Sequence, residues 1–184
     1  MALYTDVIIA GFGGQGVLLM GNMLAYAAMQ EGLQVTYMPV YGVEMRGGTA
    51  NCTVVISEEE IGSPLVMYSH SLIIMNQPSL EKFQPRLRDG GVQIVNTSIV
   101  PESLLEEDRV RSVPVPANDL ANELGNPKMA NMVALGAWVE ATGILSLERV
   151  KQGLPQVLGK WEEKIIRANH RAMQAGADRV REYA

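Results

Sequence analysis

The 184-residue sequence predicts an α/β fold, a three-layer, Rossmann-like, mostly parallel sheet with helices on both faces and a helical C-terminal third. Three observations lead to this prediction. Short β-branched runs alternate with helix-length segments, a glycine cluster joins the first run to the first helix, and the patterns beyond about residue 117 are helical. Because no linker, repeat or low-complexity tract interrupts the sequence, we expect one domain over residues 1–184.

The expected strands lie at residues 3–11, 33–40, 49–57, 71–76, 91–96 and 110–117. The first has the density of β-branched residues that is typical of a strand buried on both faces. A helix from Gly16 to about Glu31, ended by Gly32, leads to the second strand, and a right-handed crossover then makes these two strands parallel in one sheet. Between the fourth and fifth strands we expect a short helix that Gly90 and Gly91 end. The prolines of the last strand favour an edge position.

The C-terminal third is expected to form helices over residues 117–125, 127–143, 146–160 and 160–184. In the second of these, Gly136 predicts close packing, since a glycine inside a helix otherwise costs about 1 kcal/mol. In the last helix, an apolar stripe is expected from the spacing of its uncharged residues. That stripe consists of Trp161, Ile165, Ala168, Ala172 and Ala175.

Composition and charge limit the function classes. Lysine and arginine total 15 against 20 acidic residues, a formal net charge of −5, which argues against a nucleic-acid surface. No apolar run reaches the roughly 18 residues that a membrane span needs. The first residues, MALYTDV, lack the basic start and cleavage site of a signal peptide, so we expect a cytoplasmic protein.

The single cysteine, Cys52, lies in an alternating apolar strand pattern. A buried structural thiol is therefore favoured over a reactive one. One cysteine cannot ligate an iron–sulfur cluster or a structural zinc, and His70 and His170 alone make no histidine cluster. We expect no metal bound by this chain alone.

The first glycine cluster has the G-x-G-x-x-G spacing, formed by Gly11, Gly13 and Gly16, with Gly14 as a fourth glycine. It lies between a predicted strand and a predicted helix, where such glycines allow a tight turn and close approach of a ligand to the backbone. The amides at the start of the following helix would face an anion. The sequence therefore predicts a loop suited to a phosphate.

An ordinary NAD site is not favoured, because the second strand ends in VTYMPV with no acid before Glu44 to hold a ribose, and no arginine for a 2′-phosphate. A P-loop is excluded, since no Gly-Lys-Ser/Thr follows. A helix terminus contributes about 0.3–1 kcal/mol to anion binding, up to about 2 when partly buried, whereas micromolar affinity needs about 8 kcal/mol. A ligand here needs contacts from elsewhere, such as another chain. Alternatively, the glycines only let the helix start close to the sheet.

A second glycine-rich loop spans residues 41–49. Glu44 and Arg46 would project to the same side of an extended backbone, and Gly47 and Gly48 permit a sharp reversal into the next strand. One interpretation is a surface loop with a weak ion pair, contributing at most about 1 kcal/mol. The other is a polar surface at the carboxyl end of the sheet, where open α/β folds bind ligands.

Four motifs together resemble the gamma subunit of 2-oxoacid:ferredoxin (acceptor) oxidoreductases. They are GFGGQGV, YGVEMRGGTANC, IGSP and GNPKMANMVALGA, which occur in order within residues 5–180. The form EMRGGTANC looks closer to the 2-oxoglutarate and branched-chain 2-oxoacid members than to the pyruvate members.

The resemblance implies a subunit of an enzyme that converts a 2-oxoacid and coenzyme A to acyl-CoA and CO2 and passes electrons to ferredoxin. It implies that alpha and beta subunits bind thiamine diphosphate with Mg2+, and that beta and ferredoxin-like delta subunits hold 4Fe-4S clusters. This chain would bind no cofactor alone, carry no catalytic residue and be inactive by itself. An isolated chain could form a homodimer through the surface that partners cover.

The residues expected at a coenzyme A phosphate or at a subunit interface are Gly11, Gly13, Gly14, Gln15 and Gly16. The further interface residues expected are Tyr41, Glu44, Met45, Arg46, Gly47, Gly48 and Asn131. For Asn131, a helix-surface amide bonded to a neighbouring loop is an equal alternative. Two other hypotheses remain: a self-sufficient nucleotide-binding protein or NAD-dependent reductase, and a coenzyme A-binding module acting alone.

Overall fold

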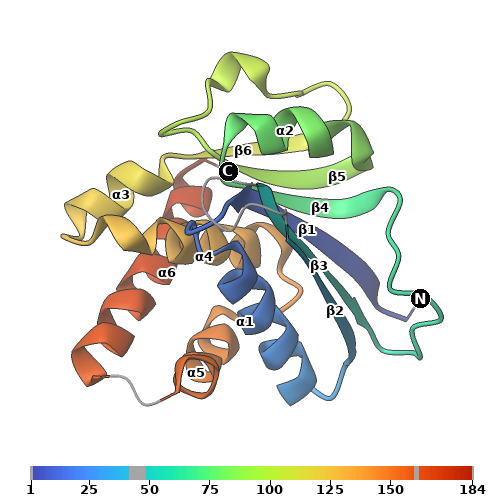
Figure 1. Cartoon of the computed structure of the whole chain (residues 1–184), viewed down its shortest axis with the longest axis horizontal. Coiled ribbons are helices and arrows are strands. Elements are labelled where there is room, and N and C mark those ends of the chain that lie inside the picture. The colour runs from blue at the N-terminus through green and yellow to red at the C-terminus, as the bar shows by residue number, and fades with distance from the viewer. Residues whose placement is uncertain (1, 42–48, 160–161, 184) are drawn as a thin grey trace.

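A computed structural model describes residues 2–41, 49–159 and 162–183, with the backbone alone at Tyr41. In these residues six strands form one sheet in the order β2-β3-β1-β4-β5-β6 (Figure 1). The strands are β1 (Tyr4–Phe12), β2 (Gln34–Tyr41), β3 (Thr49–Ser57), β4 (Ser69–Ile74), β5 (Leu87–Asn96) and β6 (Arg111–Val115).

The helices follow the sequence-based expectation in number and order over the described residues. They are α1 (Val17–Gln30), α2 (Gln77–Phe83), α3 (Ala117–Glu123), α4 (Ala130–Thr142), α5 (Leu147–Leu158) and α6 (Glu163–Tyr183). Short 3-10 turns occur at Gln84–Arg86, Glu102–Leu104 and Pro127–Met129. The helical C-terminal third is therefore confirmed.

The sheet is mostly parallel, as predicted. β1, β4, β5 and β6 pair in parallel, whereas β3 pairs antiparallel with both β1 and β2. β2 consequently runs in the same direction as β1, which the crossover argument predicts. The two strands are not neighbours, however, because β3 returns antiparallel between them. β6 lies at an edge of the sheet, as its prolines indicate.

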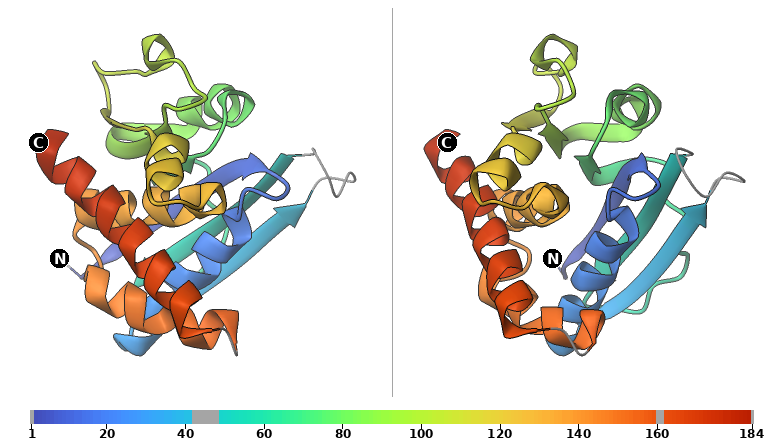
Figure 2. Two further views of the ribbon diagram at one scale, coloured as in Figure 1. Left: turned by 90° about the vertical axis from the view of Figure 1, so that its left-hand side faces the viewer. Right: turned by 60° about the vertical axis from the view of Figure 1, so that its left-hand side comes forward.

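Helices cover both faces, but unequally (Figure 2). The larger core lies between the sheet and α1, α3, α4, α5 and α6, and the smaller core lies between the sheet and α2. β1 serves both cores, since Val7 and Ile9 point into the larger one and Ile8 and Ala10 into the smaller one. This alternation explains why residues 7–10 of β1 are all apolar.

Helix α4 is the centre of the larger core, with every residue from Ala130 to Val139 buried. α6 packs on it so closely that a Cβ added to Gly136 would lie 1.9 Å from the Met173 carbonyl oxygen. A Cβ added to Gly176 would lie 1.9 Å from the Val133 carbonyl oxygen. The close packing predicted from Gly136 is confirmed, and α6 supplies the matching glycine.

Two local predictions are wrong. Gly90 and Gly91 do not end the helix after β4, because α2 already stops at Phe83 and a 3-10 turn containing Pro85 leads into β5. Gly91 instead lies inside β5, where a Cβ would come 2.9 Å from the His70 carbonyl oxygen of β4. It therefore permits the close strand contact at the register shift between Ser69 and Ser71.

The apolar stripe expected on α6 is rotated from the face that is buried. Ala172 is buried, but Ile165, Ala168 and Ala175 are only half-buried, and Trp161 lies outside the described residues. The buried face consists of Asn169, Ala172, Met173, Gly176, Ala177 and Val180. The contact between glycines on α4 and α6 sets this rotation, which a hydrophobicity pattern alone does not register.

Cys52 of β3 is buried beneath α1, as its strand pattern predicts. Its thiol donates a hydrogen bond to the Val17 carbonyl oxygen at 3.6 Å, and a Cβ added to Gly21 would lie 2.6 Å from its Sγ. Burial raises the pKa of the Cys52 thiol to about 12, against a smaller opposing effect of a backbone hydrogen bond from Gly21. The thiol is structural.

We therefore expect Cys52 not to react with a disulfide reagent at pH 8 until the chain unfolds, when one thiol should react. In the unfolded chain this thiol ionises near pH 8.5, whereas in the folded chain it stays neutral up to about pH 12. Its contribution to the free energy of unfolding is thus complete below about pH 8.5 and is lost as the pH rises from there. Thiol titration with and without urea measures this, and rapid reaction of the native chain would contradict it.

Candidate functional site

The first glycine loop closes tightly between β1 and α1. The backbone N–H of Gln15 donates a hydrogen bond to the Phe12 carbonyl oxygen at 3.1 Å, and α1 begins at Val17. Gly14 has φ +98° and Gly16 has φ +72°, a left-handed backbone that favours glycine. The backbone conformation therefore requires glycine at these two positions. Gly13, between Phe12 and Gly14, is half-exposed.

The Gln15 side chain connects this loop by hydrogen bonds to the residues that follow β4. Its Oε1 accepts hydrogen bonds from the Phe12 amide at 2.7 Å and from Asn76 Nδ2 at 3.2 Å, and its Nε2 donates to the Met75 carbonyl oxygen at 3.1 Å. A Cβ added to Gly11 would lie 2.6 Å from the same Oε1. The side chain expected to meet a cofactor is thus held by three hydrogen bonds within the chain.

Asn131 lies against the start of α1. Its side chain, in the first turn of α4, is only 7% exposed, and a Cβ added to Gly16 would lie 2.2 Å from its Nδ2. Within the described part of the chain its amide has no hydrogen-bond partner, and because its atoms are not among the buried unpaired ones there, the amide is open to solvent. The structure therefore brings together two residues, Gly16 and Asn131, that are far apart in the sequence. The alternative expected for Asn131, an amide bonded to a neighbouring loop, is not what these residues show.

The start of α1 presents free backbone amides. Among the residues that the structure describes, no side chain caps it, and no acidic residue lies in its first turn. The first amides of a helix have no partner within the helix, and together with its dipole they favour an anion. An anionic group placed here would meet these amides, the glycine backbone and the Asn131 side chain.

The loop also lies at the point where the connections change sides. After β1 the chain passes to α1 on one face of the sheet, and after the neighbouring β4 it passes to α2 on the other face. In open α/β sheets, ligands bind at the carboxyl ends of the strands at such a point. The position of the loop is thus one where a ligand is expected.

The second glycine-rich loop ends beside the first and begins two strands away from it. In the antiparallel ladder Phe12 pairs with Thr49, and Ala50 pairs with both Gly11 and Tyr41. The backbone of Tyr41 therefore lies two strands away from the glycine loop. The other residues expected at this interface lie outside the described residues: Glu44, Met45, Arg46, Gly47 and Gly48.

Asn76 is a site residue that the sequence analysis did not identify. It is 2% exposed, caps α2 by accepting from the Ser79 amide at 2.9 Å, and bonds to Gln15. The signal was present, since an asparagine at a strand end before Gln-Pro is a typical helix cap. The side chains gathered at the loop are amides, which bind and position a ligand but do not exchange protons at neutral pH.

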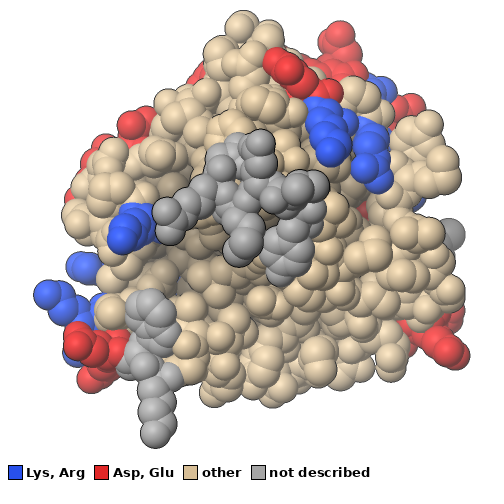
Figure 3. Space-filling view, viewed as in Figure 1, with Lys and Arg blue, Asp and Glu red and all other residues tan. Residues whose placement is uncertain are grey.

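Figure 3 shows uncharged residues over the lower middle of this view, and Lys and Arg atoms at the upper right and at the left beside the grey atoms. A surface depleted of charge is typical of the central part of a protein interface. The uncharged lower part of this face therefore suits contact with another chain.

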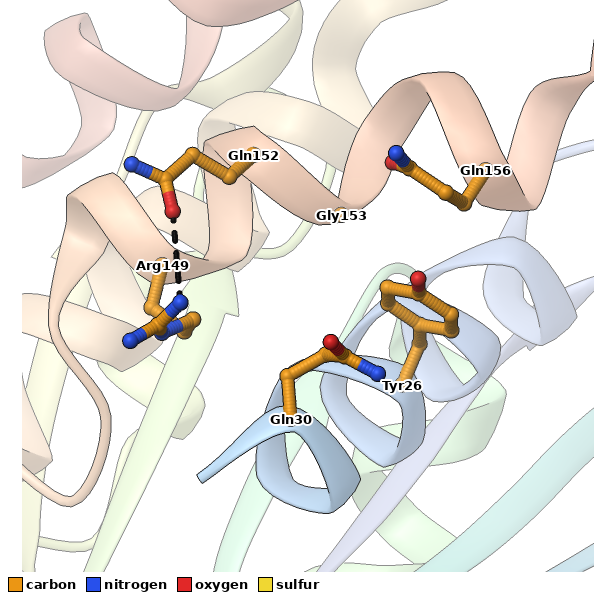
Figure 4. A pocket seen from close by; sticks show the side chains of 6 residues that line it. All are labelled: Tyr26, Gln30, Arg149, Gln152, Gly153 and Gln156. Carbon is orange, nitrogen blue, oxygen red and sulfur yellow. Dashed lines mark hydrogen bonds between the residues drawn. The ribbon is translucent and has the colours of Figure 1, made fainter. Parts of the chain in front are cut away.

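A separate small hollow of about 180 Å3 lies between the end of α1 and α5 (Figure 4). Three glutamines, Tyr26 and Arg149 line it, and Arg149 pairs with Glu31 and donates to Gln152 Oε1 at 3.4 Å. Gly153 lets Tyr26 approach α5. The arrangement serves helix packing and gathers no reactive groups.

Two features of the described residues bear on other functions. No group of three histidine, cysteine, aspartate or glutamate side chains there could hold a metal ion. Within residues 2–41, 49–159 and 162–183, none of the helices has the length and apolarity needed to cross a membrane.

The fold and the loop define a class of protein: an α/β domain with a glycine loop between the end of the interior strand β1 and a helix, and with the amide side chains of Gln15, Asn76 and Asn131 around that loop. Comparison with known proteins identifies the family. The chain belongs to the pyruvate ferredoxin/flavodoxin oxidoreductase family, whose model matches residues 6–179. This confirms the resemblance carried by the four motifs.

Individual relatives agree. Ketoisovalerate oxidoreductase subunit VorA of Methanothermobacter marburgensis is 42% identical over 176 residues, which are 95% of this chain and 36% of VorA. The chain thus spans about a third of the length of that relative. The 2-oxoglutarate synthase subunit KorC of the same organism is 37% identical over 187 residues, covering 96% of this chain and 97% of KorC. A solved gamma subunit of a keto/oxoacid ferredoxin oxidoreductase from Geobacter sulfurreducens PCA has 28% identity and a TM-score of 0.84, with 98% of each chain covered.

Proposed function

We propose that this chain, acting as one domain, is the gamma subunit of a 2-oxoacid:ferredoxin oxidoreductase. The enzyme would convert a 2-oxoacid and coenzyme A to acyl-CoA and CO2 and pass the two electrons released to ferredoxin. The full-length match to KorC and the partial match to VorA support 2-oxoglutarate or a branched-chain 2-oxoacid as the substrate. A free thiol at Cys52 agrees with a reducing compartment, and we propose the cytoplasm.

Its partners in this proposal are alpha, beta and ferredoxin-like delta subunits. Thiamine diphosphate with Mg2+ and the 4Fe-4S clusters would lie on those chains. The residues here do not fit a cluster, because the single cysteine is buried beneath α1 with a raised pKa and ligation takes several thiolates. The contribution we assign to this chain is binding and positioning.

We further propose that the glycine loop receives a phosphate of coenzyme A together with a surface of the partner subunits. The observation that carries this proposal is the Asn131 side chain, which belongs to a residue only 7% exposed and is placed against Gly16 at the start of α1. Its amide has no hydrogen-bond partner in the described residues, and neither of its polar atoms is among their buried unpaired atoms, so the amide is open to solvent. An amide in this position can donate to a ligand oxygen.

Replacing Asn131 tests the loop in the assembled enzyme. We expect Asn131→Ala to raise the KM for coenzyme A about tenfold, the loss of about 1.4 kcal/mol that one hydrogen bond provides, and to leave the KM for the 2-oxoacid unchanged. Asn22→Ala, on an exposed position of α1, is the matched control and should change neither. Equal KM values for coenzyme A in wild type and Asn131→Ala would contradict a ligand at this amide.

The subunit assignment has its own test. Purification of the tagged chain from its native cells should recover thiamine-dependent and cluster-bearing polypeptides in comparable amounts. Recovery of the chain alone, with saturable binding of NAD, FAD or coenzyme A by the isolated protein, would instead support a stand-alone nucleotide-binding protein.

A further inference from the structure

A second surface lies at the opposite end of the strands from the glycine loop. In the segment that joins β3 to β4 (Figure 1), Leu65, Met67 and Tyr68 are 72%, 76% and 59% exposed. We call these three residues the amino-edge strip. Single exposed apolar residues are ordinary, but a contiguous group marks a contact surface. The strip borders a hollow of about 380 Å3 lined by Met67, Tyr68, Pro85 and Arg86, wide enough to receive a side chain.

Two arginines hold the backbone of the strip in place. Arg86 donates from Nε to the Met67 carbonyl oxygen at 3.1 Å and from a terminal nitrogen to the Val66 carbonyl oxygen at 2.6 Å. Arg88 donates to the Tyr68 carbonyl oxygen at 3.2 Å. Three successive carbonyl groups are thus fixed while the apolar side chains remain in solvent. Such a preformed surface loses less conformational entropy when a partner binds.

Arg88 is itself positioned by a buried carboxylate. It donates to His70 Nε2 at 2.7 Å, and because a guanidinium cannot accept, this nitrogen must be the acceptor. The proton of the ring then lies on Nδ1, which donates to Asp6 at 2.5 Å. Asp6 is 2% exposed and also accepts from Ser69 Oγ at 2.6 Å and from the His70 amide at 3.0 Å. The chain of contacts runs from the sheet interior to the strip.

The IGSP motif stands directly before the strip. Ser63 accepts a hydrogen bond from the Leu65 amide at 3.2 Å through its Oγ, which forms the turn that leads into Leu65. The glycine-loop site makes no use of this motif. Because its turn leads directly into Leu65, the motif fixes the direction in which the chain enters the strip.

The charges around the strip are not neutralised within the described residues. Arg86 and Arg88 border it, and neither has an ion pair there, although the whole chain carries a net charge of −5. Lys82 and Arg86 lie over the Phe83 ring, at 5.2 and 5.5 Å from its centre. A partner segment that is apolar with flanking carboxylates complements this surface in both shape and charge.

We propose that the amino-edge strip is the docking surface for another subunit of the enzyme, which presents an apolar segment bordered by carboxylates. The proposal rests on the proposed function for the identity of that subunit. A second copy of this chain would bring the same unneutralised cations to the contact. A relative such as VorA carries nearly two thirds of its length beyond the matching region, so in that relative a domain of this kind is joined to further polypeptide.

The test measures binding of the wild-type subunit and two glutamate variants to the rest of the complex immobilised without it. Met67→Glu places a carboxylate in the strip, and Met29→Glu makes the same change at a 60% exposed methionine of α1. We expect Met67→Glu to weaken binding at least about 30-fold and Met29→Glu to remain within about twofold of wild type. Higher salt should weaken wild-type binding, because carboxylates pair with Arg86 and Arg88.

A second variant tests the arginine hydrogen bonds to the backbone of the strip rather than its apolar contact. Arg86→Gln should weaken binding and reduce hydrogen-exchange protection in the segment around the strip, with its apolar side chains unchanged. Wild-type and Met67→Glu subunits that bind equally well would overturn the inference, as would a dimer of this chain that Met67→Glu converts to a monomer. A wild-type subunit that fails to bind the complex at all would instead overturn the proposed function.

Discussion

Gly136→Ala should lower the free energy of unfolding by more than about 3 kcal/mol, enough to deplete the folded subunit. In an exposed helix the same change would stabilise by up to about 1 kcal/mol. Here the new methyl group would overlap the Met173 carbonyl oxygen at 1.9 Å, and backbone cannot move aside as a side chain can. Because α4 is buried along ten residues, a shift of α6 would open the whole core.

Urea unfolding followed by circular dichroism measures this effect. Gly176→Ala should behave in the same way, since its Cβ would meet the Val133 carbonyl oxygen at the same distance. Gly62→Ala is the control, because nothing lies within 4 Å of a Cβ there, and its midpoint should match wild type. An unchanged midpoint for Gly136→Ala would show that the helices separate without cost.

Gly16→Ala should reduce kcat/KM for coenzyme A about 100-fold in the assembled enzyme, a change of about 2.7 kcal/mol. The backbone at φ +72° disfavours any side chain, and the Cβ would lie 2.2 Å from Asn131 Nδ2, so the amide must leave its position. The start of α1 and the Asn131 side chain would then no longer face the same point. Steady-state kinetics with coenzyme A as the varied substrate measures the loss.

The double variant Gly16→Ala/Asn131→Ala separates crowding from binding. Removing the Asn131 amide relieves the overlap, so the double variant should unfold at a higher urea concentration than Gly16→Ala alone. Its activity with coenzyme A should nevertheless stay low, because the amide is absent. Recovery of activity together with stability would assign Asn131 a purely structural role.

Much of the fold could be predicted because it depends on local backbone chemistry. A β-branched run followed by glycines and a helical pattern predicts the β1–loop–α1 unit, and the structure has it at Tyr4–Gln30 with left-handed glycines at positions 14 and 16. The buried Cys52 and the packing role of Gly136 also follow from the pattern around each residue. The end of α2 was mispredicted because Gly91 serves a contact between strands, and a contact of that kind leaves no local signal.

The order of the strands was less accessible to prediction. A βαβ pattern predicts β2 as the neighbour of β1, and only with β2 in that place does the missing acid at its end argue against an NAD site. In the structure β3 lies between them, so the start of β3, at Thr49, is what stands beside the end of β1. An acid at the end of β2 would be one strand further from the loop than in a dinucleotide-binding unit.

The sequence by itself determined the class of fold, the position of the glycine loop, the family and the absence of a cluster-binding cysteine set. These depend on residue identity and on spacing over a few residues, where sterics and hydrogen bonding act directly. Only the tertiary structure decided that Asn131 lies against Gly16, that Gly176 faces α4, and that Asp6 positions Arg88 through His70. Those contacts join residues more than 15 positions apart, and they exist only because the packed core brings the backbone segments together.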